Sequence, residues 1–116
     1  MVVSEIARFV NDVKASTKFY QKLLGVNPVH SDESISIFYA GNVKILIHEK
    51  YNDSKVGSLP CENHTAFKVK SLDDSFQKMQ QDGLKFEIYP NKYEWGYSSY
   101  IRDPDGNLIE LEQELI

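Results

Sequence analysis

A glutamate near the C-terminus raises the first question about chemistry in this sequence. It lies in the stretch Arg102–Gln113, RDPDGNLIELEQ, where Pro104 and Gly106 favour a turn and the following residues alternate as in a strand. The alternation places three residues on one face of that strand: Leu108, Glu110 and Glu112. Glu110 is therefore either a solvated residue at a sheet edge or a carboxylate aimed into the protein, where it could serve as a ligand. The residues alone leave both alternatives open.

A second glutamate and a histidine occupy equivalent positions in the two halves of the chain. Three identical pairs share one spacing, since 66−7, 69−10 and 75−16 are all 59: Ala7 with Ala66, Val10 with Val69, and Ser16 with Ser75. The same spacing carries Glu5 to His64, and each is followed two residues later by one of the paired alanines. The matches indicate an internal duplication, with a carboxylate and an imidazole at the start of equivalent strands.

Both halves are predicted to contain a strand, a helix and three further strands. Residues 5–10 predict the first strand, and the helix after it has Asp12 as its N-cap and Gly25 as its stop. An apolar stripe is expected along this helix: Val13, Phe19, Tyr20, Leu23 and Leu24. Further strands are expected at 28–30, 35–39 and 43–49.

The second half repeats this order. A strand is expected at 64–70, and Ser71 with Asp74 resembles a capping box that opens the second helix. Three strands are expected after it, at 85–89, 97–102 and 108–112. The predicted fold class is therefore α+β, with two βαβββ modules in one domain, 1–116: module 1 (1–56) and module 2 (57–116).

Composition excludes several classes of protein. The net charge of −4 argues against a partner with a phosphate backbone, so no nucleic acid is expected. No apolar run approaches the length of a membrane span, and the N-terminal sequence MVVSEIARF does not resemble a signal peptide. The single cysteine, Cys61, excludes an intrachain disulfide framework. We therefore expect a cytoplasmic protein without a membrane partner.

Three stretches carry a resemblance to a known family: FVNDVKASTKFYQKLLGV, ENHTAFKV and EWGYSSYIRDPDGNLIEL. On these motifs the chain resembles the vicinal oxygen chelate superfamily of glyoxalases, bleomycin-resistance proteins and extradiol dioxygenases, and it is closest in pattern to small glyoxalase-like proteins. The DPDGN turn before a strand with a glutamate is the most specific of them. The resemblance implies a cup-shaped mixed sheet built from paired βαβββ modules. It also implies a homodimer with sites shared between chains.

The resemblance further implies a set of metal ligands. Carried over residue by residue, the ligands are Glu5, His48, His64 and Glu110. Such a set suits a divalent ion, namely Zn, Ni, Mn, Co or Fe(II). Two positions keep an alternative: Glu5 is otherwise an edge residue near the terminus, and counting from the Gly41-Asn42 turn places Ile45 rather than His48 opposite Glu110.

The function implied is that of a glyoxalase-like, metal-dependent lyase or isomerase acting on a small oxygen-chelating substrate. The metal would stabilise an enolate or oxyanion, and Glu110 would be the catalytic base. Four residues are expected to bind the substrate: Phe9, Trp95, Tyr97 and Tyr100. Phe9 gives an apolar wall where glutathione-dependent relatives have an arginine, which argues against glutathione as the substrate. The alternative is a bleomycin-resistance-type protein that sequesters a small aromatic ligand without metal or catalysis.

Overall fold

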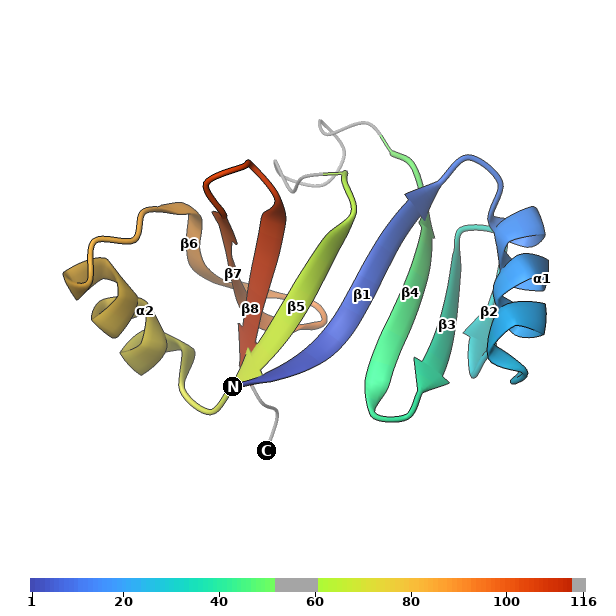
Figure 1. Cartoon of the computed structure of the whole chain (residues 1–116), viewed down its shortest axis with the longest axis horizontal. Coiled ribbons are helices and arrows are strands. Elements are labelled where there is room, and N and C mark those ends of the chain that lie inside the picture. The colour runs from blue at the N-terminus through green and yellow to red at the C-terminus, as the bar shows by residue number, and fades with distance from the viewer. Residues whose placement is uncertain (52–60, 114–116) are drawn as a thin grey trace. The chain divides into compact units, whose positions relative to one another are not determined.

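The computed structural model describes residues 1–51 and 61–113, which contain eight strands and two helices. Their order is βαβββ followed by a second βαβββ, which confirms the predicted fold class (Figure 1). The chain divides into two compact units. The N-terminal unit is Glu5–Asn63, and the C-terminal unit combines Met1–Ser4 with His64–Ile116. Neither described helix is long and apolar enough to cross a membrane.

The N-terminal unit pairs its strands in the order β2-β3-β4-β1. β1 runs parallel to β4, while β3 runs antiparallel to both β2 and β4. The elements are β1 (Val2–Val10), α1 (Val13–Leu24), β2 (His30–Ser31), β3 (Ile35–Ala40) and β4 (Val43–Glu49).

Local sequence signals define both ends of α1. The side chain of Asp12 accepts a hydrogen bond from the amide of Ala15 at 3.0 Å, as an N-cap should. Gly25 ends the helix with φ of 70°, a left-handed conformation that costs glycine nothing. The predicted stripe is wrong at Phe19 and Leu23, which are 59% and 63% exposed. Tyr20 and Leu24 pack on the core of the sheet, whereas Phe19 meets the ring of Tyr20 edge-on with the centroids 5.3 Å apart.

The sheet of the N-terminal unit has two different faces. One face holds a core of Phe38, Ile45 and Ile47, against which Tyr20 and Leu24 of α1 pack. The cross-strand pairing puts the alternate residues on the other face, which we call the Glu5 face. Its residues are Glu5, Ala7 and Phe9 of β1, Lys44, Leu46 and His48 of β4, and Ile35, Ile37 and Tyr39 of β3.

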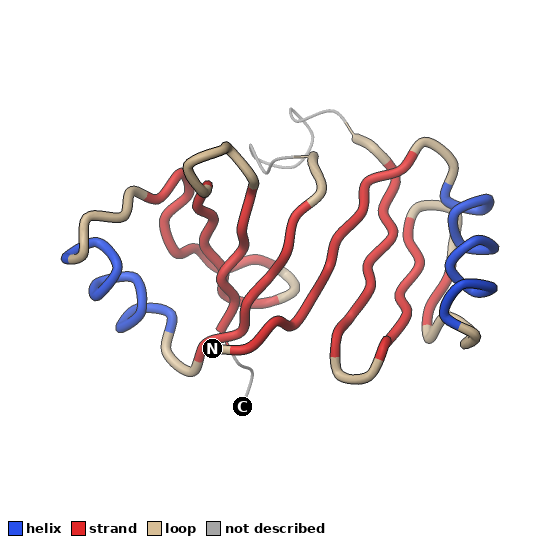
Figure 2. The backbone as a smooth tube through the Cα atoms, in the orientation of Figure 1, coloured by secondary structure: helices blue, strands red, loops and turns tan. Residues whose placement is uncertain are grey.

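The C-terminal unit repeats this plan with the strand order β5-β8-β7-β6. β5 is parallel to β8, and β7 is antiparallel to its two neighbours. Ser71 caps α2 by accepting a hydrogen bond from the amide of Asp74 at 3.3 Å, which confirms this helix start. The elements are β5 (His64–Val69), α2 (Leu72–Gln81), β6 (Phe86–Tyr93), β7 (Gly96–Arg102) and β8 (Leu108–Gln113), as Figure 2 shows by type.

The second sheet also separates a core face from a face with polar residues. Its core consists of Val69, Leu72, Phe86, Ile101 and Leu111. The residues that alternate with this core form the opposite face, which we call the Glu110 face. It carries His64, Ala66 and Lys68 of β5, Leu108, Glu110 and Glu112 of β8, and Ser98, Tyr100 and Arg102 of β7.

Candidate functional site

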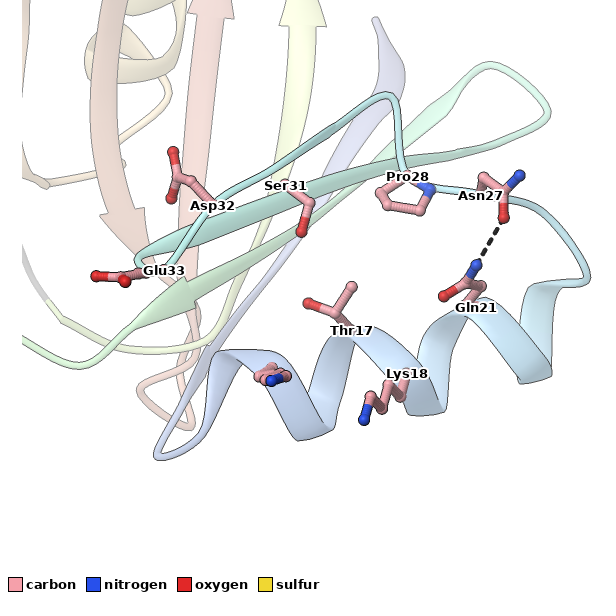
Figure 3. A pocket seen from close by; sticks show the side chains of 9 residues that line it. Thr17, Lys18, Gln21, Asn27, Pro28, Ser31, Asp32 and Glu33 are labelled. Atoms are coloured by element: carbon pink, nitrogen blue, oxygen red, sulfur yellow. Dashed lines mark hydrogen bonds between the residues drawn. The ribbon is translucent and has the colours of Figure 1, made fainter.

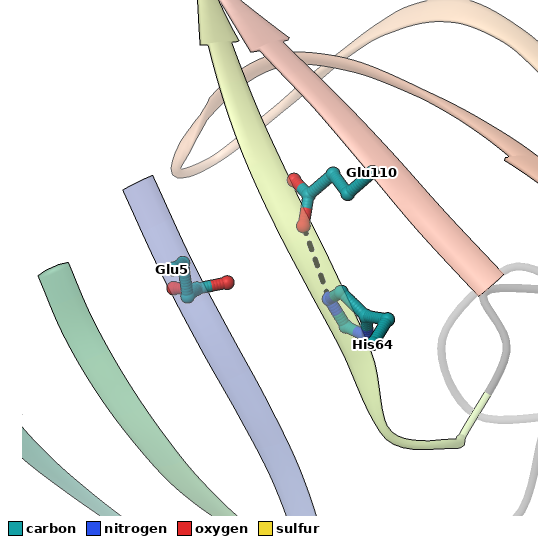
Figure 4. A group of neighbouring side chains, drawn as sticks. All are labelled: Glu5, His64 and Glu110. Atoms are coloured by element: carbon teal, nitrogen blue, oxygen red, sulfur yellow. Dashed lines mark hydrogen bonds and ion pairs between the residues drawn. The ribbon is translucent and has the colours of Figure 1, made fainter. Parts of the chain in front are cut away.

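A histidine and a glutamate meet on the Glu110 face. Nε2 of His64 lies 3.1 Å from Oε1 of Glu110, and the two side chains are only 7% and 5% exposed (Figure 4). β5 and β8 bring them together because Ala66 is the cross-strand partner of Glu110, two residues after His64. Glu110 is therefore buried rather than solvated, so the inward alternative for this carboxylate is the one the structure adopts.

The second oxygen of the Glu110 carboxylate also has a partner. Oγ of Ser98, a fully buried residue of β7, donates a hydrogen bond to Oε2 of Glu110 at 2.9 Å. Tyr100 lies directly across from Glu110, and its ring meets that of His64 edge-on with the centroids 6.1 Å apart. The carboxylate is thus fixed in orientation by side chains from both neighbouring strands.

The DPDGN turn sets the register that makes these contacts. Oδ1 of Asp103 accepts hydrogen bonds from the amides of Asp105 and Asn107, and its Oδ2 accepts one from the Asn107 side chain. The hydrogen bond from the Asn107 side chain, followed by those from backbone amides, lowers the pKa of Asp103 below its usual value. Gly106 supplies the positive φ of 89°. Because Arg102 and Leu108 pair beside this turn, Tyr100 pairs with Glu110.

The predicted ligand Glu5 lies in the N-terminal unit, on β1. It is a buried carboxylate, 6% exposed, and its cross-strand partner on β4 is Lys44. Nζ of Lys44 lies 3.4 Å from Oε1 of Glu5. Nothing in the sequence singles out Lys44, because the register of β1 on β4 depends on the tertiary fold. Glu5 is therefore a paired, buried residue and not a frayed edge residue.

The structure does not bring His48 next to Glu5. In β4, His48 is the partner of Phe9, four residues along from Lys44. Its ring contacts the rings of Phe9 and Tyr51, in each case with centroids 5.4 Å apart, and its Nδ1 donates to the carbonyl of Glu49 at 2.7 Å. His48 is thus part of an aromatic cluster at the far end of the Glu5 face.

The position equivalent to Glu110 in the first module is Leu46. Glu110 pairs with Ala66, and Leu46 pairs with Ala7, the residue that matches Ala66 at the spacing of 59. The alternative, Ile45, lies in the core beneath α1. Leu46, an apolar residue, thus occupies the position equivalent to Glu110, and His48 lies two residues further along β4, so its role as a ligand stays a prediction. Among the described residues, the grouped ligand candidates are Glu5, His64 and Glu110.

The four predicted substrate contacts separate into two groups. Phe9 lies on the Glu5 face and Tyr100 on the Glu110 face, and their contact with a substrate stays a prediction. Tyr97 lies on the opposite face of its sheet, where it packs on the core and its hydroxyl donates to Asp73 of α2 at 2.6 Å. This hydrogen bond is the main cause of a raised Tyr97 pKa. Trp95 lies in the β6–β7 turn, half exposed and stacked on Tyr93 with the ring centroids 4.6 Å apart.

A groove of about 530 Å³ lies on the helix side of the N-terminal unit (Figure 3). It runs between α1 and the segment 27–33. Two of its lining residues, Thr17 and Ser31, carry hydroxyl groups that share Ser36 as a hydrogen-bond partner: Ser36 Oγ lies 2.7 Å from Thr17 Oγ1 and 2.8 Å from Ser31 Oγ. Because these groups already satisfy each other, the groove reflects how α1 is attached to the sheet. Ser36 lies on the sheet face opposite the Glu5 face.

The donor atoms fit a divalent ion. Neighbouring ligand atoms around a tetrahedral ion are about 3.3 Å apart when the metal–ligand bonds are near 2.0 Å. The separation of 3.1 Å between His64 Nε2 and Glu110 Oε1 is close to that value. An imidazole nitrogen and a carboxylate oxygen are donor types that suit Zn, Mn, Fe(II), Co or Ni.

Comparisons with known proteins agree with this fold. A family model described as Glyoxalase/Bleomycin resistance protein/Dioxygenase superfamily matches residues 3–111. Uncharacterized protein YraH of Bacillus subtilis (strain 168) is 27% identical over 128 residues, which cover 99% of this chain and 100% of that protein. A bleomycin resistance protein of Geobacillus stearothermophilus is also 27% identical, over 91% of this chain and 92% of its own. The crystal structure of methylmalonyl-CoA epimerase from Mycobacterium tuberculosis, 17% identical, has a TM-score of 0.76 and covers 99% of this chain and 89% of that one.

Proposed function

As the chain belongs to the Glyoxalase/Bleomycin resistance protein/Dioxygenase superfamily, we propose that it is a metal-dependent lyase or isomerase acting on a small oxygen-chelating substrate. The observation that carries the proposal is the buried pair of His64 and Glu110, with Ser98 on the second carboxylate oxygen. A buried carboxylate needs partners whatever its role. Partners on both of its oxygens also fix its orientation, which a metal ligand or a catalytic base requires.

Glu5 is proposed as the third ligand. Chain continuity supports this assignment, because Glu5 directly follows Ser4, which belongs to the C-terminal unit. Ser4 Oγ donates to the carbonyl of Ala66 at 3.3 Å, and Ala66 is the cross-strand partner of Glu110. One peptide bond thus separates Glu5 from a residue anchored beside β5. With Leu46 at the fourth position, three protein ligands would leave coordination positions for two substrate oxygens, as in catalytic metal sites.

The residues divide the chemical work. A divalent ion held by Glu5, His64 and Glu110 would supply Lewis acidity to the two neighbouring oxygens of the substrate. Glu110 accepts a proton from substrate carbon through its carboxylate, which Ser98 keeps in one orientation. Tyr100 places an aromatic ring against His64 on the Glu110 face, where it can contact a bound substrate.

Metal binding by the purified protein tests this proposal. Elemental analysis after dialysis, followed by titration with Zn, Ni, Mn and Fe(II), should find about one ion per chain. Glu110→Gln should remove stoichiometric binding while the fold survives. The matched control is Glu112→Gln, since Glu112 lies two residues further along the same strand face. If Glu110→Gln retained stoichiometric metal, the assignment of Glu110 as a metal ligand would be wrong.

We propose that the ligands come from one chain, which modifies the expectation of sites shared in a homodimer. The bond between Ser4 and Ala66 supports this, because it ties the start of β1 to β5 of the same chain. The test mixes Glu5→Ala with His64→Ala subunits and measures bound metal. No recovery in a verified mixed dimer is the expected result, whereas recovered binding would show sites shared between chains.

The second candidate is a binding protein without catalysis. The relative named bleomycin resistance protein favours it, as does the cluster of Phe9, His48 and Tyr51 on the Glu5 face, which offers aromatic surface for a ligand. Calorimetric titration of the metal-free protein with metal-free bleomycin distinguishes the binding protein from the metal-dependent enzyme. Tight binding with no metal uptake would replace the enzyme proposal. A cytoplasmic location is part of either proposal.

A further inference from the structure

We propose that Lys44 is a built-in counter-charge that competes with the divalent ion for Glu5 and thereby sets the metal affinity of the site. The inference rests on the proposed function, since it takes Glu5 as a metal ligand. It concerns Lys44, a residue that no part of the ligand assignment includes.

The geometry of the pair places the lysine directly on a ligand atom. Lys44 and Glu5 are cross-strand partners in the parallel pair β1 and β4, and Nζ lies 3.4 Å from Oε1. The Glu5 side chain is 8% exposed, whereas that of Lys44 is 34% exposed. The carboxylate is therefore held inside, while the lysine reaches it along a stem that remains in contact with water.

The duplication within the chain shows that this lysine is specific to the carboxylate half. His64 is the counterpart of Glu5, and the cross-strand partner of His64 is Leu108, a residue only 3% exposed. His64 already has the Glu110 carboxylate 3.1 Å from its Nε2, so its cross-strand partner need not carry a charge. A buried carboxylate is costly without a cation nearby, and Lys44 supplies that cation.

A divalent ion and an ammonium group repel each other when both lie against one carboxylate. Binding of a divalent ion to Glu5 therefore disfavours the Lys44 ammonium at its position 3.4 Å from Oε1. Its flexible four-carbon stem and partial exposure allow the head group to withdraw into water. The lysine thus stabilises Glu5 while no metal is present, and it lowers the affinity for the metal by the same interaction.

Two variants test the proposal: Lys44→Met, which removes the charge and keeps the length, and Lys44→Leu, which copies Leu108. The control is Lys68→Met. Lys68 forms the comparable cross-strand pair in β5 and β8, with its Nζ 3.9 Å from Oε1 of Glu112, which is not an assigned ligand. Each metal-free protein is titrated with Zn by calorimetry, and its thermal unfolding is followed with and without Zn.

Lys44→Met and Lys44→Leu should bind Zn more tightly, on the order of tenfold, as expected for a group next to a metal ligand. Without Zn both should unfold at a lower temperature than the parent protein, and saturating Zn should remove most of that difference. Lys68→Met should bind Zn as the parent does. In a Glu5→Gln background, the change at position 44 should no longer affect Zn affinity.

Two negative results have different meanings. If the parent binds Zn and loses it in Glu110→Gln, but both Lys44 variants bind with parental affinity, the competition proposal is overturned and the metal site stands. If neither the parent nor the Lys44 variants bind any divalent ion, the proposed function fails and this inference fails with it.

Discussion

Oγ of Ser98 donates a 2.9 Å hydrogen bond to Oε2 of Glu110, while His64 Nε2 lies 3.1 Å from the other oxygen of the same carboxylate. Ser98 belongs to β7 and His64 to β5, so two different strands hold one side chain that β8 carries between them. This arrangement fixes both the position and the rotation of the carboxylate, which a metal ligand or a base requires.

Ser98→Ala should weaken metal binding without unfolding the protein. The substitution removes the hydrogen bond that the Ser98 hydroxyl donates to Glu110. Loss of a group that orients a ligand costs about 10–100-fold in metal affinity. Calorimetric titration with Zn measures the effect. Ser99→Ala is the control, because Ser99 is equally buried but pairs with Leu111 on the opposite sheet face. Equal affinities in the two variants would show that Ser98 does not orient Glu110.

Substitution of two buried serines, Ser36 and Ser99, should have different effects on stability. Ser36 bonds to Thr17 of α1, whereas Phe76 stands at the equivalent position of α2, since 17+59 is 76. Among the described residues, the hydroxyl of Ser99 has no hydrogen-bond partner. Ser36→Ala should therefore cost about 1–2 kcal/mol of unfolding free energy, while Ser99→Ala should be nearly neutral or stabilising. Urea unfolding of both variants measures this difference, and an equal loss in both would contradict it.

Asp103 should make the stability of the protein depend on pH in the acid range. Its pKa is lowered in the folded protein by the Asn107 side chain and by backbone amides, so the ionised form favours folding. This contribution is complete above the ordinary value of 3.8 and is lost as the pH falls through the lower folded value. Asp103→Asn should flatten the loss of stability below pH 3.8. Urea unfolding across this pH range measures how the free energy of unfolding changes with pH, with Asp105→Asn as the control for loss of a charge. The same pH dependence in Asp103→Asn as in the parent protein would contradict the prediction.

Tyr97 and Tyr100 should respond differently to substitution. Tyr97→Phe removes the hydroxyl that donates to Asp73 and should lower stability while metal and ligand binding stay unchanged. Tyr100→Leu removes a ring that meets His64 across the Glu110 face and should change ligand binding. Thermal unfolding and titration of both variants check these outcomes. If metal binding changed in Tyr97→Phe but not in Tyr100→Leu, Tyr97 rather than Tyr100 would belong to the site.

Much of the fold could be predicted because its signals are local. Asp12 and Gly25 define α1 through contacts within one turn of helix, and Asp103 braces the DPDGN turn through residues at most four positions away. Alternation along β8 correctly separated Glu110 from its neighbours Ile109 and Leu111. The spacing of 59 likewise placed Glu5 and His64 at equivalent strand positions, since duplicated modules keep the same register.

The structure adds most where residues distant in sequence have to be matched. Counting along β4 could not decide between Ile45 and His48, and the position belongs to Leu46, the partner of Ala7. The same pairing brings Lys44 to Glu5, and the packing of α2 takes Tyr97 away from Glu110. The sequence by itself therefore determined the elements and their caps, because each depends on neighbours along the chain, while it left open whether Glu110 points inward. Only the tertiary structure decided the partners across strands, because a shift in register by one residue sends every side chain to the other face of the sheet.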